Sequence, residues 1–210
     1  MPVTVPEYGY KHANAPHTFR YLIPQVDALM PAKTPGLRML DIGCGNGFNA
    51  GYFLAQGVKV TGIDPSVKGI EFSRQSHPTG RFEVMEIRDD LLQALGEAPF
   101  DVAISTEVIE HIYAPRDWAR CAFNALKPGG RLICTTPYHG YLKNVLIAAS
   151  GKFDWHVKPL WDGGHIKFWS RATLSELLRE AGFTNIQFRG AGRLPYLWMS
   201  MVLSGDKPAR

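Results

Sequence analysis

The sequence is poor in cysteine, with only three residues of this type, Cys44, Cys121 and Cys134, among 210. The three are far apart and form no CxxC pair. A disulfide framework would need an even set, and a zinc site would need closely spaced ligands, so the cysteines argue against both. This cysteine usage fits a reducing compartment, and we expect a cytoplasmic protein.

Long hydrophobic runs are also missing. The first sixteen residues, MPVTVPEYGYKHANAP, contain no apolar core of the kind that a secretory signal needs. The most apolar later stretches, 145–149 and 194–203, are too short or too interrupted to cross a bilayer. We therefore expect no cleaved signal and no membrane span.

Clusters of charge of one sign do not occur either. The formal net charge is +4, but the lysines and arginines are scattered along the chain. A nucleic-acid-binding surface usually has basic residues gathered in a patch or stripe, so we expect no nucleic-acid partner. A hydrophobic content of 45% and a length of 210 residues fit one globular domain over 1–210.

The sequence does show a regular alternation of short apolar segments with stretches long enough for helices. A last amphipathic helix begins near Ser170, a suitable N-cap, and ends near Gly182. The pattern predicts an α/β protein with a Rossmann-like, doubly wound, parallel sheet of seven strands and helices on both faces. The expected strands are 37–42, 58–63, 81–86, 100–105, 130–136, 183–189 and 196–203, and the expected crossover helices are 49–56, 66–75 and 115–126.

Two segments lie outside this alternation. Residues 1–35 are expected to form an N-terminal helical cover, with a helix over 17–30 that Pro24 breaks. Residues 138–167 contain a short helical piece at 141–149 followed by an aromatic loop. Long loops in compact domains are usually functional, so the second segment is predicted to be a lid insertion over the active site.

The most informative segment is LDIGCGNGF at 40–48, a strand that runs into a glycine turn and then a helix. Glycines allow a sharp turn and let a ligand approach the backbone closely. The dinucleotide fingerprint GxGxxG would need a glycine where Phe48 stands. Asp41 would repel a pyrophosphate but suits an ammonium group, and Asp64, at the end of the next strand, can accept hydrogen bonds from two ribose hydroxyls.

Further segments extend this pattern in order: TGIDPS at 61–66, FDVAISTEVIEH at 100–111, LKPGGRL at 126–132 and HIKFWSRATLSELLREAGF at 165–183. Together with the glycine loop they resemble the motifs of class I S-adenosylmethionine-dependent methyltransferases over roughly residues 36–190. The resemblance is nearest to the small-molecule branch that contains ubiquinone-type O-methyltransferases. It implies S-adenosylmethionine as the cofactor and transfer of its methyl group to a small-molecule acceptor.

The same resemblance implies a cofactor site. The backbone of the glycine loop should line the methionine and ribose, Asp64 should hold the ribose, and Pro65 should flank the adenine. Glu86 or Asp89 should lie near the adenine amino group, with the register between them left open. The backbone around Thr106 and Glu107 should contact the methionine amine. The glycine-loop positions in this set are Asp41, Gly43, Cys44 and Gly45.

The chemistry of the acceptor side is less constrained by the sequence. A sulfonium methyl group is already activated, so positioning matters most, and a base helps only where the acceptor is an alcohol, a phenol or a protonated amine. His139 is the first candidate base because it follows the fifth strand directly and has no adjacent carboxylate; His111 and His165 come next. His139 and His165 could equally fasten the lid by hydrogen bonds, and His111 together with Glu110 could instead cap or pin the next helix. We expect Tyr138, Trp161 and Trp169 to line a pocket for an aromatic or planar acceptor.

Several alternatives stay open at this stage. Glu107, Glu110 and His111 offer metal-ligating atoms, but the sequence assigns no fourth ligand, so no metal is predicted. A nucleic-acid methyltransferase would carry Asn/Asp-Pro-Pro-Tyr/Phe after the fourth strand, where this chain has Ser-Thr-Glu-Val. A protein acceptor, or a non-catalytic protein that binds S-adenosylmethionine, is also compatible with the fold. The acceptor atom and the oligomeric state do not follow from the sequence.

Overall fold

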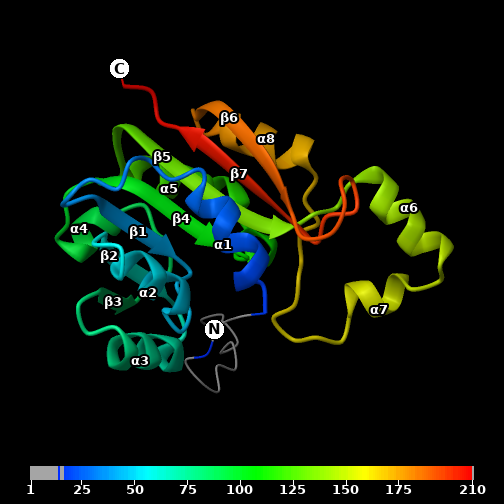
Figure 1. Cartoon of the computed structure of the whole chain (residues 1–210), viewed down its shortest axis with the longest axis horizontal. Helices are drawn as coiled ribbons and strands as arrows, with labels where there is room; N and C mark the ends of the chain where they lie inside the picture. The colour runs from blue at the N-terminus through cyan, green and yellow to red at the C-terminus, as the bar shows by residue number, and fades with distance from the viewer. Residues whose placement is uncertain (1–13, 15–16, 210) are drawn as a thin grey trace.

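The structure, a computed structural model, describes residue 14 and residues 17–209. A central sheet of seven strands has the order β3-β2-β1-β4-β5-β7-β6 (Figure 1). Most of the first sixteen residues, and with them the expectation about a signal and the start of the N-terminal cover, lie outside the described residues. The strands are β1 (Arg38–Ile42), β2 (Lys59–Asp64), β3 (Arg81–Val84), β4 (Phe100–Thr106), β5 (Leu126–Pro137), β6 (Thr184–Ala191) and β7 (Ser200–Asp206).

The sheet is mixed, which corrects the expected all-parallel arrangement. The first five strands pair in parallel, whereas β7 is antiparallel to both β5 and β6. A parallel pair needs a long crossover connection, and the short segment 192–199 between β6 and β7 cannot supply one. The last two strands therefore form a hairpin, and β7 lies between β5 and β6.

The last strand also begins later than the expected 196–203. Arg193 and Tyr196 have φ angles of 52° and 65°. A non-glycine residue in this left-handed region cannot continue an extended strand, so the segment turns before the ladder starts at Ser200. The other strands match their expected ranges within a few residues, except that β5 begins at Leu126 and bulges opposite Phe100 and Val102.

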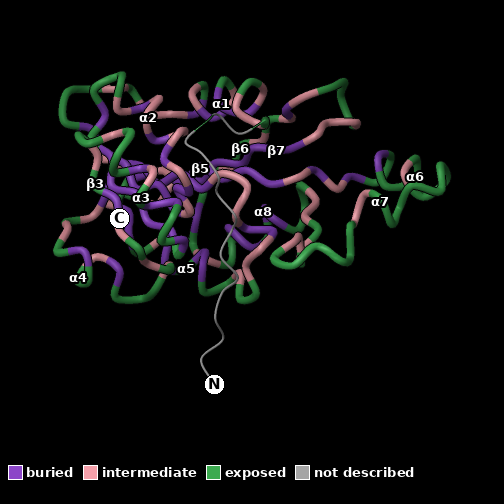
Figure 2. Tube along the Cα trace, turned by 90° about the horizontal axis from the view of Figure 1, so that it is seen from below, coloured by how far each residue is buried: buried purple, intermediate pink, exposed green. Residues whose placement is uncertain are grey.

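Helices cover both faces of the sheet, as expected (Figures 1 and 2). The helices α1 (Phe19–Asp27), α2 (Phe48–Leu54) and α3 (Val67–Ser76) bury residues in one apolar core. On the other face α4 (Leu91–Leu95), α5 (Pro115–Ala125) and α8 (Arg171–Glu180) bury residues in a second core, in which Trp118 is the largest side chain.

Helix α1 corrects one expectation, because Pro24 lies inside a continuous helix and does not break it. Proline removes one backbone donor, which would otherwise bond the carbonyl of Arg20. Both Pro24 and Arg20 are exposed, so water can reach that carbonyl. The opposite face of α1 buries Leu22, Ile23 and Val26 against the sheet, and this packing holds the helix together.

The capping of α8 is confirmed. The Ser170 hydroxyl accepts a hydrogen bond from the Thr173 amide at 3.2 Å, and the Thr173 hydroxyl accepts one from the Ser170 amide at 3.1 Å. Gly182 follows the helix with a φ of 99°. The last helix therefore begins and ends where its sequence predicts.

The segment after β5 stands away from the rest of the molecule. It contains α6 (Tyr141–Ala149) and α7 (Phe153–Val157), which project as an arm beside the edge of the sheet in two perpendicular views (Figures 1 and 2). The expected helical piece at 141–149 is confirmed by α6. That the whole segment 138–167 covers an acceptor stays a prediction. None of the described helices combines the length and the hydrophobicity that crossing a bilayer requires.

Candidate active site

The predicted site residues come together at the carboxyl ends of the parallel strands. The chain runs from β1 outward to β3 and then returns to place β4 on the other side of β1. Ligands in α/β sheets bind where the strand order reverses in this way. The loops after β1, β2, β4 and β5, which carry the residues singled out in the sequence, therefore surround one place.

The glycine loop after β1 adopts the backbone that its sequence predicts. Gly43, Gly45 and Gly47 have φ angles of 76°, 55° and 75°, and the Gly43 and Cys44 amides both donate to the Ile63 carbonyl. A Cβ added at Gly43 would lie 2.4 Å from Cγ2 of Val108. Glycine is therefore needed at position 43 both for its conformation and because the loop after β4 approaches so closely.

Gly43→Ala should destabilise the protein by about 1–3 kcal/mol, because the added methyl group combines left-handed strain with the clash against Val108. Gly57→Ala is the matched control: Gly57 has a φ of 81°, but nothing lies within 4 Å of its added Cβ. Urea unfolding should show a larger loss for position 43 than for position 57. Adding Val108→Ala should recover the difference, and equal losses at the two positions would contradict the steric explanation.

Asp64 ends β2 and is 7% exposed. Its Oδ2 accepts a hydrogen bond from the Gly45 amide at 2.9 Å, and its Oδ1 accepts one from the Ser66 amide at 2.8 Å. Burial raises the pKa of Asp64, and these two hydrogen bonds oppose the rise. The carboxylate thus joins the glycine loop to the start of α3, and its oxygens retain lone pairs for a second donor such as a hydroxyl.

Asp41 lies inside β1 and is fully buried. Neither of its carboxylate oxygens has a hydrogen-bond partner among the described residues. Burial, with a smaller contribution from the charge of Asp64, raises the pKa of Asp41 to about 7. A buried carboxylate without partners is costly, so this position fits a ligand that brings a cation or hydrogen-bond donors.

Asp41 should make the stability of the ligand-free protein fall as the pH rises. Its pKa of about 7 in the folded protein exceeds the usual aspartate value of about 4, so its contribution to stability is complete below about pH 4 and is lost as the pH rises through 7. Asp41→Asn should remove this loss, worth about 2–4 kcal/mol. Urea unfolding of both proteins at pH 5 and pH 7.5 measures it. Glu107 and Glu110 are present in both proteins, so their titration affects the two alike. An equal loss of stability between pH 5 and pH 7.5 in the parent and in Asp41→Asn would contradict the assignment to Asp41.

The remaining cofactor candidates differ in their surroundings. Cys44 is buried within the glycine loop, Pro65 is exposed after β2, and the Thr106 hydroxyl accepts a hydrogen bond from Asn49 at 3.0 Å. Glu86 is exposed. Asp89 forms an exposed ion pair with Arg120 and accepts a hydrogen bond from the Cys121 thiol. These partners leave Glu86 the more available of the two acids after β3, although the contact of either with adenine stays a prediction.

Glu107 follows β4 in a left-handed conformation, with a φ of 55°. Its amide donates to the carbonyl and hydroxyl of Thr135, whose hydroxyl in turn donates to Glu107 Oε1 at 2.8 Å. The Ser200 hydroxyl donates to Oε2 at 3.2 Å. Burial raises the pKa of Glu107 to about 7 against these hydrogen bonds. The side chain therefore fastens the end of β4 to β5 and β7, a role that the sequence did not suggest.

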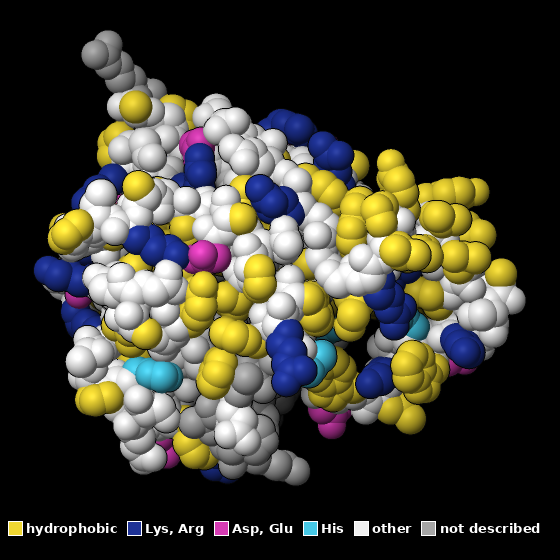
Figure 3. All heavy atoms as spheres, viewed as in Figure 1, with side chains coloured by type: hydrophobic (Ala, Val, Ile, Leu, Met, Phe, Trp, Pro, Cys, Tyr) yellow, Lys and Arg dark blue, Asp and Glu magenta, His cyan; other side chains and the backbone are white. Residues whose placement is uncertain are grey.

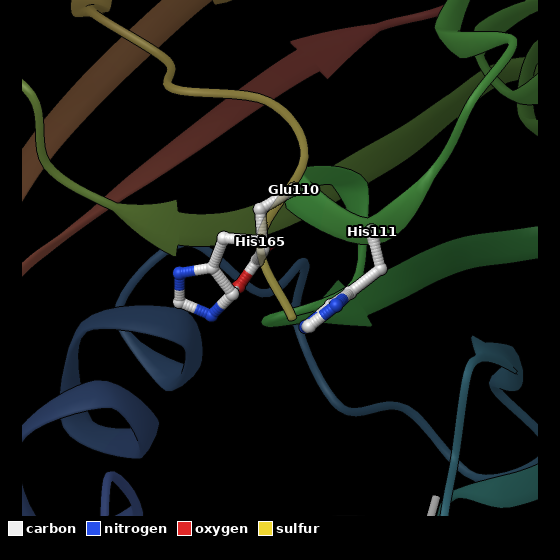
Figure 4. A group of neighbouring side chains, drawn as sticks. All are labelled: Glu110, His111 and His165. Carbon is white, nitrogen blue, oxygen red and sulfur yellow. The ribbon is translucent and has the colours of Figure 1, made fainter. Parts of the chain in front are cut away.

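Glu110, His111 and His165 form a cluster of neighbouring side chains after β4 (Figure 4). Glu110 and His111 belong to the 3₁₀ turn η1 (Ile109–His111), and His165 arrives from the segment after α7. Two backbone hydrogen bonds hold the segment that carries His165 against η1: the Glu110 carbonyl accepts them from the amides of Ile166 and Lys167. The rings of His111 and His165 lie edge to face with centroids 4.9 Å apart.

The protonation of this cluster follows from its contacts. His111 Nδ1 lies 2.9 Å and 3.2 Å from the carbonyl oxygens of Gly163 and Gly164, so Nδ1 carries the hydrogen and Nε2 carries the lone pair. Burial lowers the pKa of His111, and burial together with His111 lowers the pKa of His165 to about 4. Burial and the charge of Glu107 raise the pKa of Glu110 well above its usual value. Both imidazoles are therefore neutral near pH 7.

The cluster also has the composition of a metal site. Donor atoms of Glu110, His111 and His165 lie within 4.8 Å of one another, and both Glu110 oxygens are buried without a hydrogen-bond partner among the described residues. Neutral imidazoles and a carboxylate are common ligands of divalent transition metals. The sequence offers Glu107 as the third possible ligand beside Glu110 and His111. In the structure His165 takes that place.

The other acceptor-side candidates lie at different depths. Trp161 joins the cluster, with its ring centroid 6.1 Å from that of His111 and 5.4 Å from that of His165. Tyr138 follows β5 and is buried in the core that α5 and α8 cover, where its ring meets that of Trp198. Trp169 is half-buried, and its indole N–H donates to the Ile109 carbonyl at 3.3 Å. Of the three aromatic residues, Trp161 is the one beside the cluster.

His139 lies after β5, with its ring against Phe168 and His156 and its Nδ1 3.4 Å from Asn144 Oδ1. Burial, assisted by the positive charge of Lys143, lowers the pKa of His139 to about 4. Sequence reasoning missed both Lys143 and His156 as neighbours of this ring. The spacing of Lys143, four residues after His139 at the start of a helix, was the available signal.

The comparisons with known proteins agree with this geometry. The model of a family described as "Methyltransferase domain" matches residues 14–188. The ubiquinone biosynthesis O-methyltransferase of Cereibacter sphaeroides is 30% identical over 184 residues, which cover 86% of this chain and 73% of that protein. The protein of the same name from Roseobacter denitrificans is 32% identical over 183 residues, covering 85% and 72%.

Among solved structures, a SAM-dependent methyltransferase from Thermotoga maritima, described as a possible histamine N-methyltransferase, superposes with a TM-score of 0.63 at 19% identity. The match covers 88% of this chain and 86% of that one and shows the fold. The chain belongs to the methyltransferase-domain family. It is a class I S-adenosylmethionine-dependent methyltransferase with a Rossmann-like fold, and S-adenosylmethionine is its methyl donor.

Proposed function

We propose that this enzyme O-methylates a small planar acceptor that carries a phenolic or enolic hydroxyl. The single observation that carries the proposal is the His111 ring after β4, whose Nδ1 donates toward two backbone carbonyls, which makes Nε2 the basic nitrogen of the imidazole. Phenols ionise near pH 10, so a neutral imidazole beside the hydroxyl assists their methylation. The names of the Cereibacter and Roseobacter relatives support an oxygen acceptor.

S-adenosylmethionine supplies a methyl group already activated on a sulfonium sulfur. Asp41 would receive the ammonium of the methionine moiety, directly or through water, and Asp64 would accept hydrogen bonds from the ribose hydroxyls. The close backbone of Gly43 and Gly45 would lie along the methionine and ribose, with Pro65 beside the adenine. These groups orient the donor, and the chain contributes no covalent step.

On the acceptor side, His111 would accept the hydroxyl proton at Nε2. The Gly163 and Gly164 carbonyls would then stabilise the imidazolium through Nδ1–H, since hydrogen bonds to a charged donor are stronger. The exposed Trp161 ring beside His111 would stack on a planar acceptor. We place His111 before His139 as the base because a pKa of about 4 makes the His139 imidazole a weak proton acceptor.

The test is a methyl-transfer assay with S-adenosylmethionine labelled in its methyl group and matched acceptors. A catechol, its monomethyl ether and the corresponding aromatic amine share a ring but differ in the accepting atom. The expected product is the O-methyl ether of the catechol, identified by mass spectrometry. Methylation of the amine alone would overturn the oxygen assignment, and binding of S-adenosylmethionine without turnover of any acceptor would support the non-catalytic alternative.

A second candidate chemistry at the same place is metal-assisted methylation, favoured by the buried oxygens of Glu110, which accept no hydrogen bond from the described residues and lie beside two neutral histidines. A bound divalent ion would lower the pKa of an acceptor hydroxyl. If His111 acts as a base, turnover should survive dialysis against EDTA. Loss of turnover that one divalent ion restores would assign the cluster to a metal instead.

We further propose that the enzyme works in the cytoplasm on a small molecule. All three cysteines are free and buried, which supports a reducing compartment. Expression of the protein fused to a fluorescent reporter, followed by fractionation, tests this location. Recovery of the fusion from an oxidising compartment would contradict it.

A further inference from the structure

The arm formed by residues 141–168 has an unusual surface. Of the fifteen large hydrophobic side chains that are exposed in the described part of the chain, ten belong to this arm. In the space-filling view, hydrophobic side chains gather over α6 at the end of the molecule (Figure 3). Isolated exposed apolar residues are normal, but a contiguous patch marks a surface that binds something.

The exposed residues of α6 follow helical periodicity. Tyr141, Leu142, Val145 and Leu146 lie on one stripe of the helix and are 43–86% exposed. The one charged side chain of α6, Lys143, is buried on another side, where its Nζ donates to the carbonyls of Tyr138 and Met199. Lys143 thus fixes the base of the helix to the body while the apolar stripe points outward.

Aromatic and basic side chains continue this surface through α7. Phe153 is 57% exposed, Trp155 is 74% exposed and Leu160 is 96% exposed. Lys152 and Lys158 lie between them, and the Lys158 ammonium is 5.9 Å from the centre of the Trp155 ring. The arm carries four lysines against two aspartates, so its charge is positive. Figure 3 shows Lys and Arg side chains beside the hydrophobic ones in this region.

This combination favours a lipid surface over a second protein copy. Tryptophan, tyrosine and lysine with an outward aliphatic stripe are typical of segments that lie in the headgroup region of a bilayer. The arm projects from the body, so a flat surface can reach it without contacting the rest of the molecule (Figure 2). In a symmetric dimer this surface would have to pair with itself, which would bring the like-charged lysines of the two arms together.

We propose that the arm is a peripheral membrane anchor. The α6 stripe and the Phe153–Leu160 segment enter the headgroup and upper acyl region of a bilayer, and Lys152 and Lys158 contact anionic lipid headgroups. The cluster of Glu110, His111 and His165 lies beside the same segment, because His165 and Trp161 lie on the return of the arm to the body. Bound in this way, the enzyme receives acceptors that partition into the bilayer.

The experiment is sedimentation of the full chain with vesicles of phosphatidylcholine alone or mixed equally with phosphatidylglycerol. Binding to the mixed vesicles is expected, with a weakening as salt rises because the lysine contribution is screened. Leu142→Ser combined with Leu146→Ser should lower the binding constant by about tenfold or more, since two aliphatic side chains no longer enter the lipid. Lys152→Gln combined with Lys158→Gln should remove the preference for the anionic vesicles.

Val67→Ser combined with Val84→Ser is the matched control. These exposed valines belong to α3 and β3, which lie on the opposite side of the molecule from the arm (Figure 1). This variant should bind vesicles as the parent does. Calorimetry with S-adenosylmethionine checks that every variant is folded, independently of any acceptor. Equal loss of binding in the control, or no sedimentation of the parent with either vesicle, would overturn the anchor. So would light scattering that shows a dimer which the α6 substitutions dissociate without vesicles.

Discussion

Replacing Asp64 with alanine is expected to weaken the binding of S-adenosylmethionine by about 2–4 kcal/mol. The substitution removes the proposed acceptor of both ribose hydroxyls, and it also releases the amides of Gly45 and Ser66 that the carboxylate holds in the free protein. The loss therefore has a direct part and a part from a less ordered loop. Isothermal titration calorimetry at neutral pH measures the sum.

Asp117→Ala is the matched control, because Asp117 is an exposed aspartate on α5 that is paired with Arg120 and belongs to neither the glycine loop nor the predicted adenine contacts. An exposed ion pair contributes little, so S-adenosylmethionine affinity should barely change. Asp64→Asn should lose less than Asp64→Ala, since its single amide oxygen can still accept a hydrogen bond from one of the two backbone amides. Unchanged affinity in Asp64→Ala would remove the proposed ribose contact.

Replacing His111 with alanine is expected to lower kcat by about 10²–10⁴-fold on a phenolic acceptor, the range typical of a lost general base. Affinity for S-adenosylmethionine should stay the same. Burial lowers the pKa of His111, so the neutral imidazole persists below the usual histidine pKa and the acidic limb of the parent rate profile lies correspondingly low. The variant should lose that limb. Rates measured between pH 4.5 and 9 check both effects.

His139→Ala and His165→Ala serve as comparisons, since both histidines were candidates from the sequence. If His139 is the base, its variant and not that of His111 will lose the acidic limb. If all three variants keep the parent kcat, the enzyme works by positioning alone, and the acceptor is a neutral amine or an activated carbon.

Most of the fold could be predicted because its signals are local. The glycine spacing after β1, the N-cap at Ser170 and the alternation of apolar strands with helices each depend on a few neighbouring residues. The direction of β7 could not be read in this way, because an apolar run has no orientation and the deciding feature is the left-handed backbone at Arg193 and Tyr196. Likewise, a proline breaks a helix only where the lost backbone hydrogen bond leaves a carbonyl without a partner. At Pro24 the carbonyl of Arg20 is on the exposed side of α1, where water can bond to it.

The cofactor side of the site was more predictable than the acceptor side for a similar reason. Asp41 and Asp64 occupy fixed positions on consecutive strands, so their place follows from the strand pattern. His165 meets Glu110 only because the segment after α7 returns to η1 through two backbone hydrogen bonds. Backbone contacts of this kind have no side-chain pattern. The fastening of Glu107 by Ser200 depends in turn on β7, the strand whose direction the sequence did not reveal.

The antiparallel course of β7 determines where the chain can be attached to a support. Ser200 pairs with Pro137 at the carboxyl edge of the sheet, and Asp206 pairs with Arg131 near the opposite edge. Beyond it, Lys207 exchanges backbone hydrogen bonds with Gly129 and Gly130. A tether fused after the last residues would therefore leave the molecule on the side away from both the glycine loop and the arm. A protein immobilised through that tether should present both of these surfaces to the solution.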